Sequence, residues 1–135
     1  MTDATRAPRE RPLSPHTSIW RWHITMAASI ATRITGVGLY LGALILAAWA
    51  ISLASGPEAY ATFKGVMGSF LGKVVLFGMT LSFFYHLAAG VRHIVWDLGH
   101  ALTVRQANAF SVASFAFAGA ATIAVWVIAG LIGAL

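Results

Sequence analysis

The 135-residue chain has no cysteine, four acidic residues and only 10% charged residues. Without cysteine it can form no disulfide, attach no haem covalently and ligate no iron–sulfur cluster of its own. Soluble domains carry about 25% charged residues. Here hydrophobic residues make up 59% of the chain, more than a soluble fold of this size could bury. The composition therefore identifies an integral membrane protein, and any cluster chemistry must belong to another polypeptide.

Three long runs of the sequence carry no charge at all. They cover 24, 18 and 30 residues, at positions 34–57, 74–91 and 106–135. A membrane-spanning helix needs about 20 apolar residues, and the second run reaches that length if Lys73 snorkels to the headgroups. Because every backbone polar group must be satisfied inside lipid, helices are the expected conformation.

The predicted fold class is therefore all-α, with three transmembrane helices over about 26–53, 66–95 and 109–133 in one anchor domain, 24–135. The preceding segment, 1–23, is polar at its start and lacks the apolar core of a signal peptide, so we expect it to be retained. Its last part contains Trp20 and Trp22 beside Arg21, a combination typical of the headgroup layer. Glycines four residues apart, at positions 38 and 42 and at 68 and 72, suit close helix packing.

The formal net charge of +5 is explained by membrane topology rather than by nucleic-acid binding, since the basic residues cluster beside the apolar runs. Lys and Arg near span ends mark the cytoplasmic side. Seven basic residues lie before the first run or after the second: Arg6, Arg9, Arg11, Arg21, Arg33, Arg92 and Arg105. Two basic residues, Lys64 and Lys73, lie between the first and second runs. The N-terminus and the 92–108 loop are therefore predicted to face the bacterial cytoplasm or the mitochondrial matrix.

His86 is the only histidine within an uncharged run, six residues before Arg92. A helical rise places it roughly 9 Å inward of that charge, and ionisable groups at such depth are candidates for function. Three interpretations remain open from the residues: a histidine bonded to a neighbouring helix, a proton relay, or an axial haem ligand. Gly90, one turn away on the same face as His86 and His93, would leave room for a flat macrocycle.

The haem interpretation carries a geometric condition. His86 and His93 lie about 10 Å apart along one helix face, so they cannot bind a single iron from both sides. The first and third runs contain no histidine. A haem with two histidine ligands would therefore need a second chain, and Arg33, Arg92 and His93 could neutralise its propionates.

Ser29 and Arg33 are four residues apart and share a helix face at the start of the first span. One interpretation is that Arg33 only anchors the helix by snorkelling. The other is a polar pocket for a quinone head, whose oxygens become negative on reduction. A hydroxyl donor and a guanidinium would stabilise that charge.

"RPLSPHTSIW…SIATRITG", followed by "HLAAGVRHIVWDLG", resembles the cytochrome b subunits of succinate dehydrogenase, over about positions 11–100. The resemblance implies a membrane anchor of respiratory complex II, half of a heteromeric helix bundle in an inner membrane. Such a subunit performs no chemistry alone. It works with a second membrane anchor, an iron–sulfur subunit and a flavoprotein that oxidises succinate, and it passes electrons to ubiquinone.

The resemblance also implies site residues. His86 matches the axial ligand of haem b, the other ligand coming from the second anchor, while Ser29 and Arg33 match residues of the ubiquinone pocket. His93 is a further candidate for a haem propionate. The family often has histidine directly before the arginine, where this chain has Thr32, so that contact is not carried over. A haem-free anchor and a homodimeric b-type cytochrome remain the alternatives.

Overall fold

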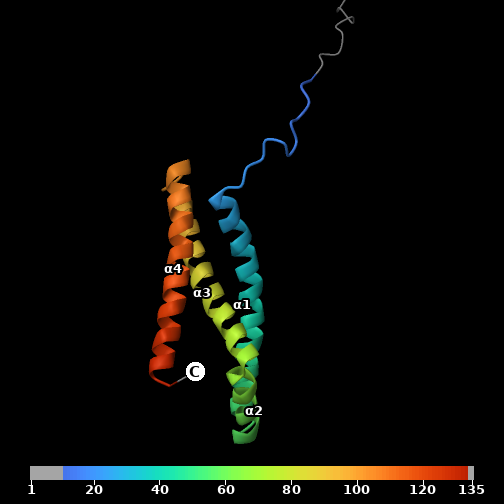
Figure 1. Ribbon diagram of the computed structural model, residues 1–135, viewed down its shortest axis with the longest axis vertical. Coiled ribbons are helices and arrows are strands. Elements are labelled where there is room, and N and C mark those ends of the chain that lie inside the picture. Colours follow the sequence, from blue (N-terminus) through green and yellow to red (C-terminus); the bar gives the residue numbers. More distant parts are fainter. Residues whose placement is uncertain (1–10, 134–135) are drawn as a thin grey trace, which may run out of the picture.

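The computed structural model describes residues 11–133, and the predicted all-α class is confirmed for them (Figure 1). Residues 1–10, with Arg6 and Arg9, lie outside the described part, as do 134–135. The helices are α1 (Ile24–Ala54), α2 (Pro57–Gly68), α3 (Phe70–Asp97) and α4 (Val104–Leu131). Three of them, α1, α3 and α4, are long and apolar enough to cross a membrane.

The helix bounds differ from the predicted spans by more than two residues at two places. Helix α4 begins at Val104, where we expected a span from 109. We expected a single span from 66 to 95, but α2 already occupies part of that range and α3 begins at Phe70. Ser69 separates them with an extended backbone, ψ 162°, and its side chain accepts a hydrogen bond from the Gly72 amide at 3.1 Å. The short helix α2 had no signal in the charge pattern, because its polar residues read as a loop between two spans.

Local signals explain where the helices start. Gly56 has φ 107°, a left-handed conformation that favours glycine, and Pro57 follows it at the first position of α2. Thr103 and Gln106 form a capping box at the start of α4. Such caps satisfy amides that the helix leaves free and stabilise it by about 1 kcal/mol.

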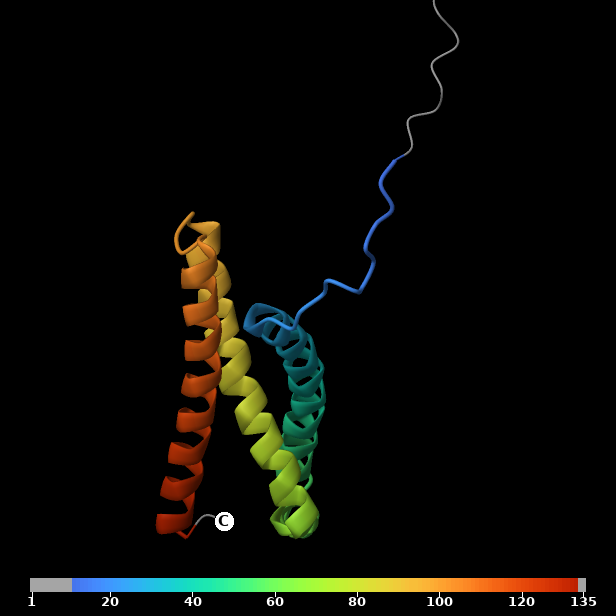
Figure 2. The same cartoon turned by 45° about the horizontal axis from the view of Figure 1, so that its top comes forward.

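Helix α3 is the centre of the bundle and packs against both α1 and α4 (Figures 1 and 2). The core is small and centres on Tyr85, Ala89 and Ala118. Tyr85 reaches across to α1, where its hydroxyl donates to the Ala28 carbonyl at 2.7 Å. Its ring also lies 4.8 Å from that of Phe115 on α4. A single side chain therefore ties all three long helices together.

The contact between α1 and α3 depends on a glycine predicted to suit close packing. A Cβ added at Gly38 would lie 2.8 Å from the Ser82 hydroxyl oxygen, and one at Gly42 would lie 2.9 Å from the end of Met79. Because Ser82 is short, it cannot move away as the methionine tip can. The missing side chain at position 38 lets the two backbones approach, as membrane helices do at small residues.

Most of the long helices' surface is not covered by the chain itself. Only 6%, 11% and 17% of the most apolar windows of α1, α3 and α4 are buried. Leucine, isoleucine, valine and phenylalanine side chains point outward along all three. Such a surface needs lipid or another protein around it.

Candidate functional site

His86 lies in the middle of α3, half-buried against α1. Its Nδ1 is 3.2 Å from the hydroxyl oxygen of Thr35, and its Cε1 faces Gly36. The Thr35 hydroxyl has a single proton and donates it to the Ala31 carbonyl at 2.8 Å. With that proton donated to Ala31, the Thr35 hydroxyl can accept from His86, and this arrangement corresponds to the tautomer with the imidazole proton on Nδ1.

This hydrogen bond leaves Nε2 of His86 with its lone pair free, and within the described part of the chain Nε2 has no hydrogen-bond partner. Metal-bound histidines characteristically donate their other N–H to a fixed acceptor, which holds the ring in place. Thr35 supplies that acceptor. The imidazole thus contacts α1 through Nδ1 and Cε1, and its second nitrogen has no partner among the described residues.

A cavity of about 360 Å³ lies beside His86, lined by Leu39, Phe83, Leu87, Gly90, Val91 and Ile94. Apart from the imidazole, its walls are apolar. A Cβ at Gly90 would meet no atom within 4 Å, so open space lies beside that glycine. The face predicted to hold His86, Gly90, His93 and Asp97 is thus divided: the first two share this cavity, while His93 and Asp97 do not line it.

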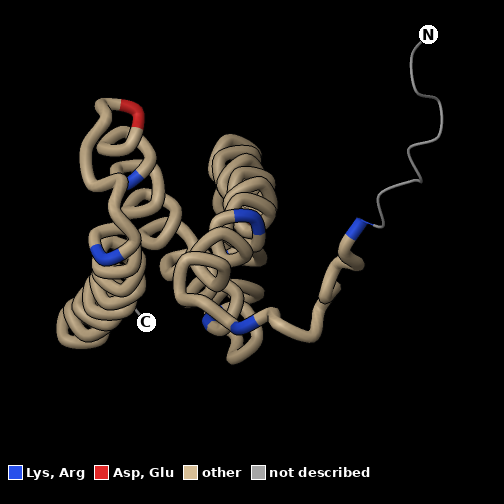
Figure 3. The backbone as a smooth tube through the Cα atoms, turned by 90° about the horizontal axis from the view of Figure 1, so that it is seen from above, with Lys and Arg blue, Asp and Glu red and all other residues tan. Residues whose placement is uncertain are grey.

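A second cavity of about 270 Å³ brings Ser29 and Arg33 together with His93 and Arg92 at the end of the bundle where α1 begins. Thr25, Thr32 and Trp96 complete its lining. Arg33 Nη1 donates to the Ser29 hydroxyl oxygen at 3.2 Å. Figure 3 shows the helices end-on from this side, with basic positions in blue. Ser29 and Arg33 on α1 and His93 on α3 therefore face one shared space.

Arg92 is the buried charge of this end, only 3% exposed. Its Nη1 donates to the Ser111 hydroxyl on α4 at 3.0 Å, and its guanidinium lies 4.9 Å from the centre of the Trp96 ring. Within the described residues Nε has no partner. The Arg92 side chain thus joins α3 to α4 and contributes a cation to the cavity that also contains Arg33.

No carboxylate of the described residues balances these cations at the cavity. The acidic residues of the described part of the chain are Glu58 and Asp97, and neither lines this cavity. Two guanidinium groups around one small space repel each other, and a low-dielectric surrounding increases the cost. The arrangement therefore favours an anionic group, or one that becomes negative, bound between Arg33 and Arg92.

The sequence did not reveal two contributors. Thr35 was not singled out, because a threonine within an apolar run carries no signal of its own; the spacing between Thr35 and His86 becomes meaningful only when α1 and α3 pack. Ser111 was also missed as the partner of Arg92. Within residues 11–133, no three His, Cys, Asp or Glu side chains converge on a metal site.

Comparison with known proteins gives consistent matches. The family model described as succinate dehydrogenase/fumarate reductase transmembrane subunit matches residues 7–125. The succinate dehydrogenase cytochrome b556 subunit of Paracoccus denitrificans is 38% identical over 116 residues, covering 86% of this chain and 88% of that protein. The corresponding subunit of Rickettsia felis is 36% identical over 99 residues, 73% of this chain and 77% of its own length. The mitochondrial cytochrome b560 subunit of Sus scrofa is 38% identical over 100 residues, 71% of this chain and 58% of that protein.

Proposed function

Because the chain belongs to the succinate dehydrogenase/fumarate reductase transmembrane subunits, we propose that it binds haem b through His86 and forms part of a ubiquinone site around Ser29 and Arg33. The resemblance seen in the sequence is thereby confirmed at the level of the family. In this function the chain anchors the enzyme in the membrane and helps electrons pass from an iron–sulfur subunit to quinone.

The observation that carries the haem assignment is the hydrogen bond between Thr35 and His86. It leaves Nε2 unprotonated beside an apolar cavity in which Gly90 provides space. These features fit an axial ligand better than a proton relay, which would need a partner at Nε2 as well. Haem, when bound, supplies a one-electron redox centre. His86 would hold the iron, and Thr35 would orient His86 through the contact at 3.2 Å.

A second anchor subunit is part of this proposal. Among the described residues His86 is the sole histidine that lines that cavity, so a second histidine ligand for haem would come from another polypeptide. The uncovered apolar faces of α1, α3 and α4 provide surface on which such a subunit can pack. The cofactor is then shared across the interface between two different chains. An iron–sulfur subunit and a flavoprotein complete the complex.

The cavity around Arg33 and Ser29 supports the quinone assignment. Their side chains are already hydrogen-bonded to each other, so the guanidinium and the hydroxyl are held where a carbonyl oxygen could accept from both. Arg33 stabilises the negative charge that reduction places on quinone oxygens, and Ser29 donates a hydrogen bond. Arg92 and His93 line the same space. They can offset the charge of haem propionates or of the reduced substrate.

The basic residues of the described part also support an orientation. Five arginines lie before α1 or at the end of the bundle where α1 begins, and two lysines lie at the other end: Arg11, Arg21, Arg33, Arg92 and Arg105, against Lys64 and Lys73. Positive charge is enriched on the cytoplasmic side. We therefore place the N-terminus on the cytoplasmic side of a bacterial inner membrane, or on the matrix side in a mitochondrion.

Visible spectroscopy of the purified complex tests the haem assignment. Reduced-minus-oxidised spectra should show a b-type signal, and His86→Ala should lose it while the complex still assembles. His100→Ala, three residues beyond the end of the same helix and outside both cavities, is the matched control and should keep the signal. An unchanged spectrum in His86→Ala would show that His86 is not the haem ligand. The chain would then be a haem-free anchor, or another residue would bind the haem.

Parallel activity assays test the quinone site. In Arg33→Ala, reduction of ubiquinone should fall by about 100-fold, the loss associated with removal of one charge-stabilising donor. Succinate oxidation with a soluble dye should be unaffected, and Arg105→Ala should leave both activities intact. Equal loss of both activities in Arg33→Ala would show that the arginine serves assembly and not quinone reduction.

A further inference from the structure

A cavity of about 430 Å³ lies at the end of the bundle opposite Arg33, between α2 and the start of α3. Two cations line it, Lys64 and the half-buried Lys73, together with the aromatic residues Trp49, Tyr60 and Phe63. The Lys64 ammonium lies 5.9 Å from the centre of the Tyr60 ring. Neither Glu58 nor Asp97, the acidic residues of the described part, lines this cavity. It is therefore a basic pocket with an aromatic rim, a combination typical of the headgroup layer of a membrane.

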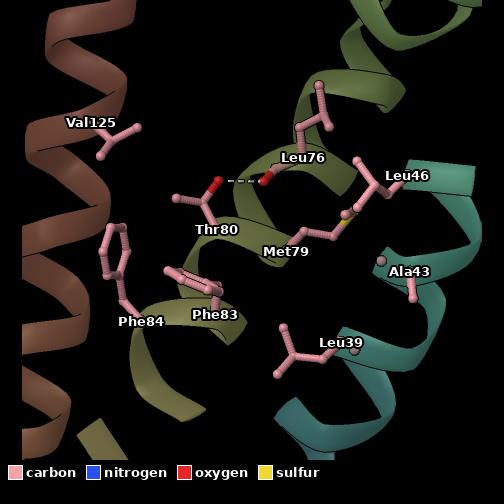
Figure 4. Close-up of a pocket in the computed structure, with 11 residues that line it drawn as sticks. Leu39, Ala43, Leu46, Leu76, Met79, Thr80, Phe83, Phe84 and Val125 are labelled. Carbon is pink, nitrogen blue, oxygen red and sulfur yellow. Dashed lines mark hydrogen bonds between the residues drawn. The ribbon is translucent and has the colours of Figure 1, made fainter. Parts of the chain in front are cut away.

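An apolar groove of about 480 Å³ continues from this pocket between α1, α3 and α4 (Figure 4). Leu76 lines both spaces. Leu39 and Ala43 come from α1, Phe83 from α3 and Val125 from α4. The Thr80 hydroxyl donates to the Leu76 carbonyl at 2.8 Å, so it needs no polar group of a ligand. The groove accepts hydrocarbon and nothing charged.

The combined length of the two spaces matches one membrane leaflet. On α1 the lining extends from Gly38 to Trp49, and on α3 from Phe84 back to Lys73. Eleven helical steps span about 16.5 Å, close to half of a hydrocarbon core about 30 Å thick. A basic pocket at the headgroup level with an apolar groove one leaflet long has the dimensions of a lipid.

We propose that the Lys64 pocket and the adjoining groove bind one anionic phospholipid. The phosphate lies between Lys64 and Lys73, and an acyl chain lies along Leu76, Ala43 and Leu39. Lysine ammonium groups bind phosphate as compact charges and need no bidentate geometry. The aromatic side chains hold the glycerol region at the interface. This lipid would fill the space between the diverging ends of α1 and α4 and support the bundle there.

The pocket and the groove each argue against another occupant. A free phosphate ion would bind in the basic pocket but would leave the groove without a function. A helix of a partner subunit would need its own carboxylates to satisfy two lysines. An anionic lipid satisfies the charge and fills the groove with one molecule.

Native mass spectrometry of the delipidated complex in neutral detergent tests this proposal. Phosphatidylglycerol should bind at one site, and phosphatidylcholine with the same acyl chains should bind much more weakly. Each of Lys64→Gln and Lys73→Gln should weaken phosphatidylglycerol binding by about fivefold, and the double variant by about 25-fold, from the usual contribution of one basic residue near an anionic headgroup. Arg105→Gln, at the other end of the bundle, is the matched control and should bind as the unaltered complex does.

A second variant tests the groove without changing any charge. Ala43→Phe should fill the groove and reduce phosphatidylglycerol binding, while inorganic phosphate should compete poorly with the lipid in the unaltered complex. The haem spectrum and quinone reduction should be retained in the lysine variants, so a failure here is distinct from a failure of the haem or quinone assignment. Unchanged lipid binding in the double lysine variant, or in Ala43→Phe, would overturn the proposal. Competition by inorganic phosphate at equal concentration would show a site for free anions and overturn it as well.

Discussion

Replacing Thr35 by valine removes the hydroxyl that orients His86 and keeps the shape of the side chain. In the structure this hydroxyl lies 3.2 Å from Nδ1, where it can accept the imidazole proton, and it donates to the Ala31 carbonyl of its own helix at 2.8 Å. Valine would leave the Nδ1–H without an acceptor. The ring could then rotate, or take the tautomer with its proton on Nε2, and in either case fewer molecules would present a lone pair to iron.

The size of the effect follows from the surroundings of the pair. A buried donor left unpaired costs about 1–3 kcal/mol, and loss of such a supporting contact typically lowers metal affinity by 10- to 100-fold. Both Thr35 and His86 are half-buried, so water can partly replace the lost bond. We therefore expect the lower end of the range, a haem affinity reduced about tenfold.

Haem transfer from the purified complex to an excess of a haem-binding acceptor protein measures this affinity. Thr35→Val should lose haem about ten times faster than the unaltered complex, and Thr35→Ser, which keeps the hydroxyl, should lose it at nearly the original rate. Thr122→Val is the matched control, because that buried hydroxyl bonds only to the Ala118 carbonyl of its own helix, at 2.7 Å. Equal rates for Thr35→Val and Thr122→Val would refute the role assigned to the hydrogen bond.

Two further predictions concern the packing that places the site. Ser111→Ala should lower the free energy of unfolding by about 1.5–3 kcal/mol, the value for a hydrogen bond to a charged group, since it removes the interhelical partner of Arg92 at 3.0 Å. Thermal unfolding in detergent measures this loss of stability. Ser114→Ala is the control, because the Ser114 hydroxyl bonds only to its own helix. Equal stability of the two variants would contradict a stabilising role for the hydrogen bond between Arg92 and Ser111. Gly38→Leu should destabilise the α1–α3 contact by about 1–3 kcal/mol through overpacking, because Ser82 lies 2.8 Å from where its Cβ would be. Gly78→Leu is the control, because a Cβ at position 78 would meet no atom of the described chain within 4 Å. A loss of stability as large in Gly78→Leu as in Gly38→Leu would show that the close approach of α1 and α3 is not the cause.

The sequence by itself determined the helical membrane fold. In lipid an apolar run has one way to satisfy its backbone, so the uncharged runs led directly to α1, α3 and α4. The separate motifs around Arg33 and His86 also identified the family, since each places polar side chains at a fixed helical spacing. These signals are local: they depend on neighbours within a few turns of one helix.

Only the tertiary structure decided what those residues face. Thr35 and His86 are 51 positions apart, and their hydrogen bond exists because α1 and α3 pack closely at Gly36 and Gly38. The burial of Arg92 likewise depends on Ser111 of α4, which no spacing within α3 could indicate. Helix α2 and its lysine pocket were not foreseen either, because a break at a single serine has no signature in hydrophobicity. Contacts between helices are set by the shapes of the packed side chains and not by the spacing of residues along one helix, so a pattern in the sequence cannot specify them.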